Sequence, residues 1–262
     1  MPRPIASGFI TGGTTLVTDP PAATAAPVFV LVHSPSVGPR TWQPVAEVLR
    51  GVGWDAIVPS LRHIAEGAPP FWPHVADAVA QAVVGLDEGR PVILALHSNA
   101  GIFAPVITTG LGRAVAGCMF VDASLPARSG ETPVAPPELL PFLRSKSSDG
   151  VLPPWTYWWD ESDVAPMFPD EATRQAVTAE QPRLPLAYYE ERVPVPPGSD
   201  DRPCAYVLFG PPYDETAAAA RARGWPVEHL PGKHLHMIVD PVGVARLLTT
   251  LANRAGMASS KP

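Results

Sequence analysis

Six short runs of apolar residues recur along the chain, and segments with helical spacing separate most of them. The runs span residues 28–32, 54–59, 91–96, 115–121, 204–209 and 227–230. A run without a polar face is typical of a strand in a parallel sheet, because helices cover both faces of such a sheet. Apolar residues three or four positions apart predict helices over 41–52, 72–86, 101–109, 215–223 and 242–251. This alternation predicts an α/β fold with a doubly wound, mostly parallel sheet.

The alternation stops once, over residues 127–202, and then resumes. This stretch holds much of the unusual proline content of the chain, which is 35 of 262 residues, about 13% against a usual share of about 5%. It also holds clusters of aromatic residues and a helix-like segment at 170–181. We therefore expect one core domain, made of 1–126 and 203–262, with a cap of residues 127–202 inserted before the penultimate strand.

The two ends of the chain carry weaker signals. β-prone residues flank a Gly-Gly pair at 9–17, which predicts a hairpin, and 257–262 has the composition of a frayed tail. The N-terminal residues lack an apolar segment of signal-peptide length. No apolar run approaches the roughly 18 residues that a membrane-spanning helix needs. We expect a cytoplasmic protein that does not enter a membrane.

Charge and cysteine content exclude several kinds of partner. The net charge is −6 and the basic residues are scattered singly, whereas a nucleic-acid-binding surface needs a clustered basic face. Cys118 and Cys204 both lie in apolar runs, which predicts buried thiols in a reducing compartment. The seven histidines form no ligand cluster beyond one His-x-His pair. We expect no metal, no other cofactor and no nucleic-acid partner.

Polar residues stand at the carboxyl ends of three predicted strands. They are His33, Ser98 and Asp122, and a further histidine, His234, lies in the loop before the last helix. In open α/β sheets, ligands bind at the carboxyl ends of the strands. The sequence therefore predicts a functional site at this edge of the sheet.

Ser98 lies where a buried strand gives way to a helix, in the segment Leu-His-Ser-Asn-Ala-Gly at 96–101. A nucleophile elbow is usually G-x-S-x-G, because small residues allow the sharp turn. Leu96 and Ala100 replace the two glycines of that pattern. A second interpretation is that Ser98 only caps the following helix, a position that serine favours.

The motifs taken together resemble the α/β-hydrolase superfamily, in its esterase- and hydroxynitrile-lyase-like branch with a cap. The segments that carry the resemblance are 28–33, Trp42, 96–101, 231–234 and Pro241, with the serine first and the histidine last. The resemblance covers nearly the whole chain. It implies the α/β-hydrolase fold and a reaction among those of esterases, lactonases, thioesterases, carbon–carbon bond hydrolases and hydroxynitrile lyases.

Within this resemblance, Ser98 is the expected nucleophile and His234 the expected base, since it follows a glycine-containing loop and precedes a helix that begins with proline. His236 is expected to be a packing residue, and His97 is expected to face away across the elbow. Two carboxylates could orient the base. Asp122 is favoured because an unpaired carboxylate at the end of a buried strand would be costly. Asp214 is the alternative, although an aspartate at the mouth of a helix is also an ordinary N-terminal residue.

Acyl transfer also needs two donors aimed at the developing oxyanion. The backbone N–H of Asn99, immediately after the nucleophile, is the first. The resemblance places the second two residues after His33, but that residue is Pro35, which has no N–H. The Ser34 hydroxyl or the Ser36 N–H is the expected replacement.

The predicted cap contains Trp155, Trp158 and Trp159, which either line the roof of a pocket over Ser98 or form a small core of the cap. The function expected from all these features is cofactor-free hydrolysis of an ester, lactone, thioester or C–C bond in a bulky apolar small molecule. One alternative is a lyase, cyclase or dehydratase of specialised metabolism that uses Ser98 and His234 for acid–base chemistry. Another is a non-catalytic protein that binds a small ligand.

Overall fold

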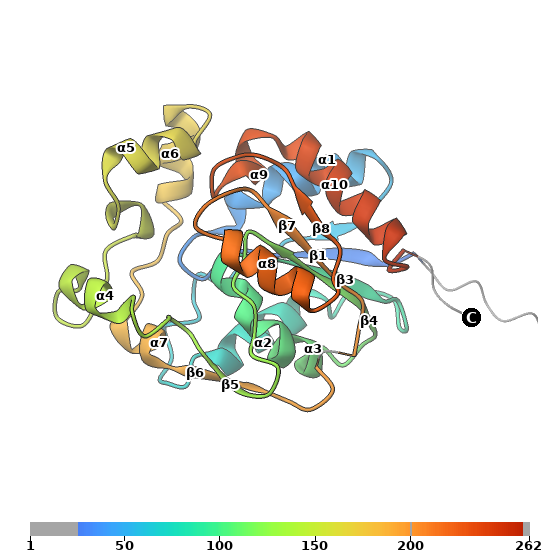
Figure 1. Cartoon of the computed structure of the whole chain (residues 1–262), viewed down its shortest axis with the longest axis horizontal. Coiled ribbons are helices and arrows are strands. Elements are labelled where there is room, and N and C mark those ends of the chain that lie inside the picture. The colour runs from blue at the N-terminus through green and yellow to red at the C-terminus, as the bar shows by residue number, and fades with distance from the viewer. Residues whose placement is uncertain (1–25, 200, 259–262) are drawn as a thin grey trace, which may run out of the picture.

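A six-stranded parallel sheet forms the centre of the molecule (Figure 1), as the computed structural model of residues 26–199 and 201–258 shows. The strand order is β2-β1-β3-β4-β7-β8, and every neighbouring pair is parallel. The strands are β1 (Val28–Val32), β2 (Ala56–Ile57), β3 (Val92–His97), β4 (Val115–Val121), β7 (Cys204–Leu208) and β8 (Val227–His229). The predicted doubly wound, mostly parallel sheet is confirmed.

Helices cover both faces of this sheet, which explains why its strands are apolar at consecutive positions. In β3, Leu94 and Leu96 belong to one buried cluster, and Ile93 and Ala95 belong to the other. The first face is covered by α2 (Trp72–Ala82), α3 (Ala104–Gly110) and α8 (Asp214–Ala222). The opposite face is covered by α1 (Gln43–Gly51), α9 (His236–Val239) and α10 (Pro241–Arg254).

Several elements differ in extent from the expectation, and the helix expected over 72–86 ends at Ala82. The strand expected at 54–59 is paired only over Ala56 and Ile57, and Pro59, which has no N–H for a ladder, follows closely. The helix expected from residue 101 begins earlier, as a 3₁₀ segment, η2 (Ser98–Phe103), that leads into α3.

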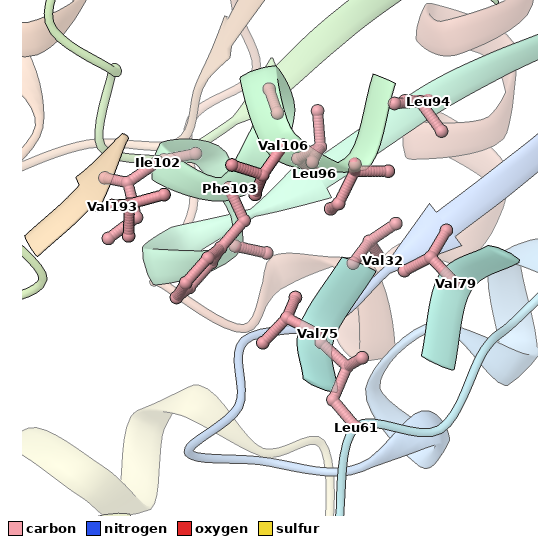
Figure 2. Close-up of a cluster of buried hydrophobic side chains, with 14 of the residues drawn as sticks. Val32, Leu61, Val75, Val79, Leu94, Leu96, Ile102, Phe103, Val106 and Val193 are labelled. Carbon is pink, nitrogen blue, oxygen red and sulfur yellow. The ribbon is translucent and has the colours of Figure 1, made fainter. Parts of the chain in front are cut away.

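The segment 127–202 carries its own small elements on one side of the sheet (Figure 1). They are β5 (Gly130–Pro133), α4 (Leu140–Lys146), η3 (Trp155–Tyr157), α5 (Glu161–Val164), η4 (Ala165–Met167), α6 (Glu171–Thr178), α7 (Leu186–Glu190) and β6 (Arg192–Val195). β5 and β6 form an antiparallel pair. Tyr188 and Val193 lie in the same buried cluster as Phe103, and Figure 2 shows Val193 beside the η2 residues of the core. Val164, Phe168 and Val177 belong to the second buried cluster, so this segment packs continuously with the core in both clusters.

Hydrogen bonds and an ion pair join the same segment to η1 (Pro39–Thr41), the 3₁₀ helix before α1. The carboxylate of Glu180 accepts the backbone N–H of Arg40 at 2.9 Å and pairs with the Arg40 guanidinium at 3.2 Å. The Glu180 carbonyl accepts from Arg62 Nε at 3.0 Å. Several bonds to one residue fix the segment to the core at this point.

The predicted hairpin at 9–17 lies outside the described residues, as does 259–262. Met257 is buried against Gly117, so the expected frayed tail does not begin there. Cys118 and Cys204 are buried register partners in β4 and β7, and their thiols are hydrogen-bonded. Across 26–199 and 201–258, no helix has the length and hydropathy to cross a bilayer.

Candidate active site

Ser98 stands at a sharp turn between β3 and η2. Its φ is +58°, in the left-handed region that residues with a side chain rarely adopt. The backbone N–H of Ser124 donates to the Ser98 carbonyl at 3.1 Å and holds the turn against the end of β4. A Cβ atom on Gly101 would lie 2.1 Å from the Ser124 carbonyl oxygen. Glycine is required at 101 because the turn brings these two backbones into contact.

Leu96, which stands where a glycine is usual, is fully buried. Figure 2 shows its side chain in the core cluster with Ile102, Phe103 and Val106 of the segment that follows the turn. Leucine is therefore compatible with the turn, since its side chain fills the core under it. Ala100 is also fully buried.

Three side chains form a continuous hydrogen-bonded chain at this turn. His234 Nδ1 lies 2.7 Å from Asp122 Oδ2, and His234 Nε2 lies 2.9 Å from Ser98 Oγ. An ionised carboxylate only accepts hydrogen bonds, so Nδ1 carries the proton and Nε2 accepts from the serine. The backbone N–H of Phe209 donates to the other oxygen, Oδ1, of Asp122 at 3.0 Å. Each group thus has one defined role in the chain.

Asp122 is the carboxylate that the structure brings to His234. Its side chain is 1% exposed, and its φ is +44° as the chain turns out of β4. Asp214, the alternative considered from the sequence, is exposed in the first turn of α8. The strand order explains the difference, because β4 lies between β3 and β7 and its end therefore meets both Ser98 and the β7 loop.

The expectation that His97 faces away is wrong. Its ring centroid lies 4.6 Å from that of His234, and its Nε2 lies 2.9 Å from the His234 carbonyl oxygen, which accepts. Burial, followed by the nearby His234, holds the pKa of His97 well below its ordinary value. A neutral His97 therefore fixes the backbone of His234 through the hydrogen bond to its carbonyl oxygen. His236 packs beside Phe209 and against Gly232, as expected.

A second neutral histidine holds the loop after β1. His33 Nε2 accepts from the backbone N–H of Leu61 at 3.1 Å, so its Nδ1 carries the proton and donates to the Ser34 carbonyl at 2.8 Å. Burial lowers the pKa of His33 to about 4. These two bonds set the course of the loop that carries Ser34 and Ser36.

Ser34 and Ser36 both line the cavity over Ser98. The N–H of Ser36 points to Ser34 Oγ at 3.4 Å, and Ser36 Oγ is 2.6 Å from the Tyr189 hydroxyl. The Ser36 N–H is thus directed to a partner within the loop, whereas the Ser34 hydroxyl uses only its oxygen in that bond and keeps its hydrogen. The hydroxyl of Ser34 is therefore better placed than the Ser36 N–H to meet a ligand.

The Asn99 side chain is held by the segment 127–202. Its Nδ2 donates to the Val134 carbonyl at 2.8 Å, and its Oδ1 accepts from the Tyr188 hydroxyl at 2.5 Å. Both polar atoms of the Asn99 side chain are thus engaged. Its side chain is part of the scaffold.

Tyr213 is the site residue that sequence reasoning missed. Its ring stacks on the imidazole of His234, with centroids 5.2 Å apart and planes 7° apart, and its hydroxyl lies 3.4 Å from Ser98 Oγ. The available signal was its place in the loop after β7, at the carboxyl end of a strand. The sequence instead indicated the next residue, Asp214, because its carboxylate is a possible partner of the base.

A cavity of about 810 Å³ opens over Ser98 and His234. Trp155, Trp158 and Trp159 all line it. The Trp155 ring lies 5.9 Å from the His234 ring, whereas Trp158 is buried and its indole N–H donates to the Pro153 carbonyl at 2.8 Å. All three tryptophans thus border the cavity, and Trp158 is in addition buried in the packing of the segment. Among the residues that the structure describes, no group of His, Cys, Asp and Glu is arranged to hold a metal ion.

The fold has well-matched counterparts, although no protein-family model and no curated protein sequence matches the chain. An extracellular α/β-hydrolase from a Paenibacillus species, described as homologous to tobacco salicylic acid binding protein 2, has a TM-score of 0.65 and 18% identity, with 86% of this chain and 98% of that chain covered. A pyrethroid hydrolase has a TM-score of 0.66 and 17% identity, with coverages of 88% and 100%. A variant of tomato methylketone synthase I in complex with β-ketoheptanoate has a TM-score of 0.65 and 15% identity, with the same coverages. At these identities the likeness concerns the fold.

Proposed function

Because this chain has the α/β-hydrolase fold, we propose that it is a cofactor-free serine hydrolase. The observation that carries the proposal is the chain of hydrogen bonds from Ser98 through His234 to Asp122. The chain of bonds ends at Ser98, whose backbone φ is +58°. Ser98 lines a cavity large enough for a small molecule. A serine that only capped a helix would need neither the base nor the carboxylate.

In the proposed reaction, Ser98 Oγ attacks a carbonyl carbon while its proton moves to His234 Nε2. Asp122 stabilises the imidazolium that forms, through the bond to Nδ1. When the tetrahedral adduct collapses, the leaving atom takes the proton from Nε2 and departs, which leaves Ser98 acylated. Water, activated by the same histidine, then attacks the acyl group, and the proton returns to Ser98.

The developing oxyanion requires two donors. The backbone N–H of Asn99 follows the nucleophile directly. For the second donor we assign the Ser34 hydroxyl, whose oxygen already accepts from Ser36 and whose hydrogen can therefore turn into the cavity. This arrangement compensates for Pro35, which has no N–H to offer.

The lining of the cavity supports a bulky apolar substrate. The three tryptophans, Leu139 and Met167 contribute apolar surface, and the lining also includes polar residues such as Ser34 and Ser36 and the charged residues Glu138, Asp163, Glu215 and Lys233. Ligand sites are typically apolar with a few polar groups that fix orientation. The bond that is cleaved is that of an ester, a lactone or a thioester, or an activated C–C bond. Each of these substrates presents an electrophilic carbonyl to Ser98.

Pro35 favours one second candidate function. Without the usual backbone donor, Ser98 and His234 could exchange protons with a substrate and never form an acyl-enzyme, as in a lyase, cyclase or dehydratase. In that case His234→Ala would abolish turnover, whereas Ser98→Ala would lower it only in part. A covalent adduct would not accumulate.

The test is covalent labelling with a fluorophosphonate, followed by peptide mass spectrometry. We expect one adduct on Ser98, no adduct in Ser98→Ala, and slow labelling in His234→Ala. Ser145→Ala, which removes an exposed hydroxyl on α4, is the matched control and should label as the wild type does. A burst of p-nitrophenolate from a p-nitrophenyl ester would show the acyl-enzyme directly. An unlabelled Ser98 in folded wild-type protein would refute the serine hydrolase.

A further inference from the structure

The phenol of Tyr213 occupies the space beside the reacting atoms of the proposed site. Its hydroxyl is 3.4 Å from Ser98 Oγ, and its ring lies flat against the ring of His234. We propose that Tyr213 is a catalytic residue whose hydroxyl donates a hydrogen bond to the leaving atom of the substrate. This inference rests on the proposed serine hydrolase function and deepens it.

The direction of the hydrogen bond follows from the neighbouring bonds. Ser98 donates its only hydrogen to His234 Nε2, so its oxygen can accept from Tyr213 but cannot donate to it. Burial raises the pKa of Tyr213 to about 12, an effect that hydrogen bonds with Ser98 and Ser124 oppose. The phenol is therefore neutral at physiological pH, and in its hydrogen bond with Ser98 only the phenol can donate.

The position of the leaving atom follows from the proton transfer. That atom must come within hydrogen-bond distance of His234 Nε2 to receive the proton, and it is bonded to the carbon that Ser98 Oγ has attacked. The point of departure therefore lies between Nε2 and Ser98 Oγ. The hydroxyl of Tyr213 borders this point, because its ring stacks in parallel beside the imidazole and its oxygen is 3.4 Å from Ser98 Oγ.

The step balances without any further reactant. The bond between the carbonyl carbon and Ser98 Oγ stays intact, and the bond from that carbon to the leaving atom breaks. The electron pair of the broken bond goes to the leaving atom, which also receives the proton from His234 Nε2. Tyr213 keeps its own proton throughout and stabilises the partial negative charge by a hydrogen bond. This donor is needed most where the leaving atom is basic, and least where the leaving group is already a stable anion.

The test compares Tyr213→Phe with the wild type on a series of phenylacetate esters. Phenylalanine keeps the ring that stacks on His234 and removes only the hydroxyl. With ethyl phenylacetate, whose leaving group is a basic alkoxide, we expect kcat/KM to fall by at least about tenfold, in line with the loss of one good hydrogen bond. With p-nitrophenyl phenylacetate we expect a change of less than about twofold. The slope of log kcat/KM against leaving-group pKa should therefore become steeper.

Tyr157→Phe is the matched control, since Tyr157 is 65% exposed on η3. It should leave the slope unchanged. Equal losses for both esters in Tyr213→Phe, or no loss for either, would overturn the role of Tyr213. Fluorophosphonate labelling of Ser98 in the same samples separates the two proposals: labelling with an unchanged slope refutes only Tyr213, whereas absence of labelling in the wild type refutes the hydrolase and this role with it.

Discussion

His234 donates from Nδ1 to Oδ2 of Asp122 over 2.7 Å, a bond that joins residues 112 positions apart. The remaining oxygen of Asp122 is held by the N–H of Phe209, and the carboxylate is almost fully buried. This rigid, water-excluded contact leaves the imidazole one orientation and one tautomer. Substitution of Asp122, with Asp214 as the comparison, tests whether this contact orients His234.

Asp122→Asn should lower kcat by about 10³- to 10⁴-fold, because an amide that keeps the Phe209 bond presents NH₂ to His234 and imposes the wrong tautomer. Steady-state hydrolysis of a p-nitrophenyl ester measures the effect. Asp214→Asn changes an exposed carboxylate in the first turn of α8 and should keep wild-type activity. If Asp122→Asn retained full activity while Asp214→Asn lost it, Asp214 would be the orienting acid.

Ser34→Ala should lower kcat by about 10²- to 10³-fold if its hydroxyl is the second oxyanion donor. The substitution removes one oxygen and leaves the Leu61–His33 bond that sets the loop. Ser145→Ala serves again as the control for loss of a hydroxyl. An unchanged kcat in Ser34→Ala would remove this residue from the site and return attention to the Ser36 N–H.

Gly101→Ala tests the contact that makes the turn at Ser98 possible. The added Cβ would lie 2.1 Å from the Ser124 carbonyl oxygen, so the backbone must move, at a cost of about 1–3 kcal/mol. We expect a lower urea midpoint and slower fluorophosphonate labelling of Ser98. Gly51→Ala is matched, because a Cβ there meets nothing within 4 Å, and it should leave both measurements near the wild-type values. Equal stability and labelling in both variants would show that the turn does not depend on this contact.

The buried His33 makes stability depend on pH. Its pKa is about 4 in the folded protein against 6.5 in the unfolded chain, so the unfolded state binds the additional proton between these values. The free energy of unfolding should therefore fall as the pH drops from 6.5 toward 4, by about 2 kcal/mol at pH 5 from this group. Urea unfolding at pH 7 and pH 5 measures the change.

The comparison variant is His33→Asn, which cannot titrate and should show a smaller loss between pH 7 and pH 5. His229→Asn, at an exposed position in β8, should keep the wild-type loss. A His33→Asn variant with an unaltered pH dependence would mean that His33 is not the group responsible.

Much of the fold was predictable because its signals are local. β1 and β3 are buried at every position, and only a strand covered on both faces gives such an apolar run. The lengths of elements were less predictable, as with β2, since pairing depends on the neighbouring strand as well as on the segment itself. The position of Ser98 was indicated by its strand-to-helix context, although Leu96 obscured the usual motif.

The partners of Ser98 were predicted unevenly. His234 stood in a recognisable loop, whereas the sequence left Asp122 and Asp214 as alternatives because both follow strands. His97 was misplaced because its sequence position beside Ser98 does not show that its ring turns toward His234. Tyr213 was overlooked because a single tyrosine carries no spacing signal.

By itself, then, the sequence determined the parallel sheet, the edge of the sheet at which polar residues gather and the location of the turn, since each depends on neighbouring residues. Only the tertiary structure decided which carboxylate reaches His234 and which phenol lies beside Ser98. The physical reason is that these contacts join residues more than a hundred positions apart. They depend on the order of β3, β4 and β7 and on left-handed backbone at Ser98 and Asp122. Neither feature can be predicted from the residues of a single segment.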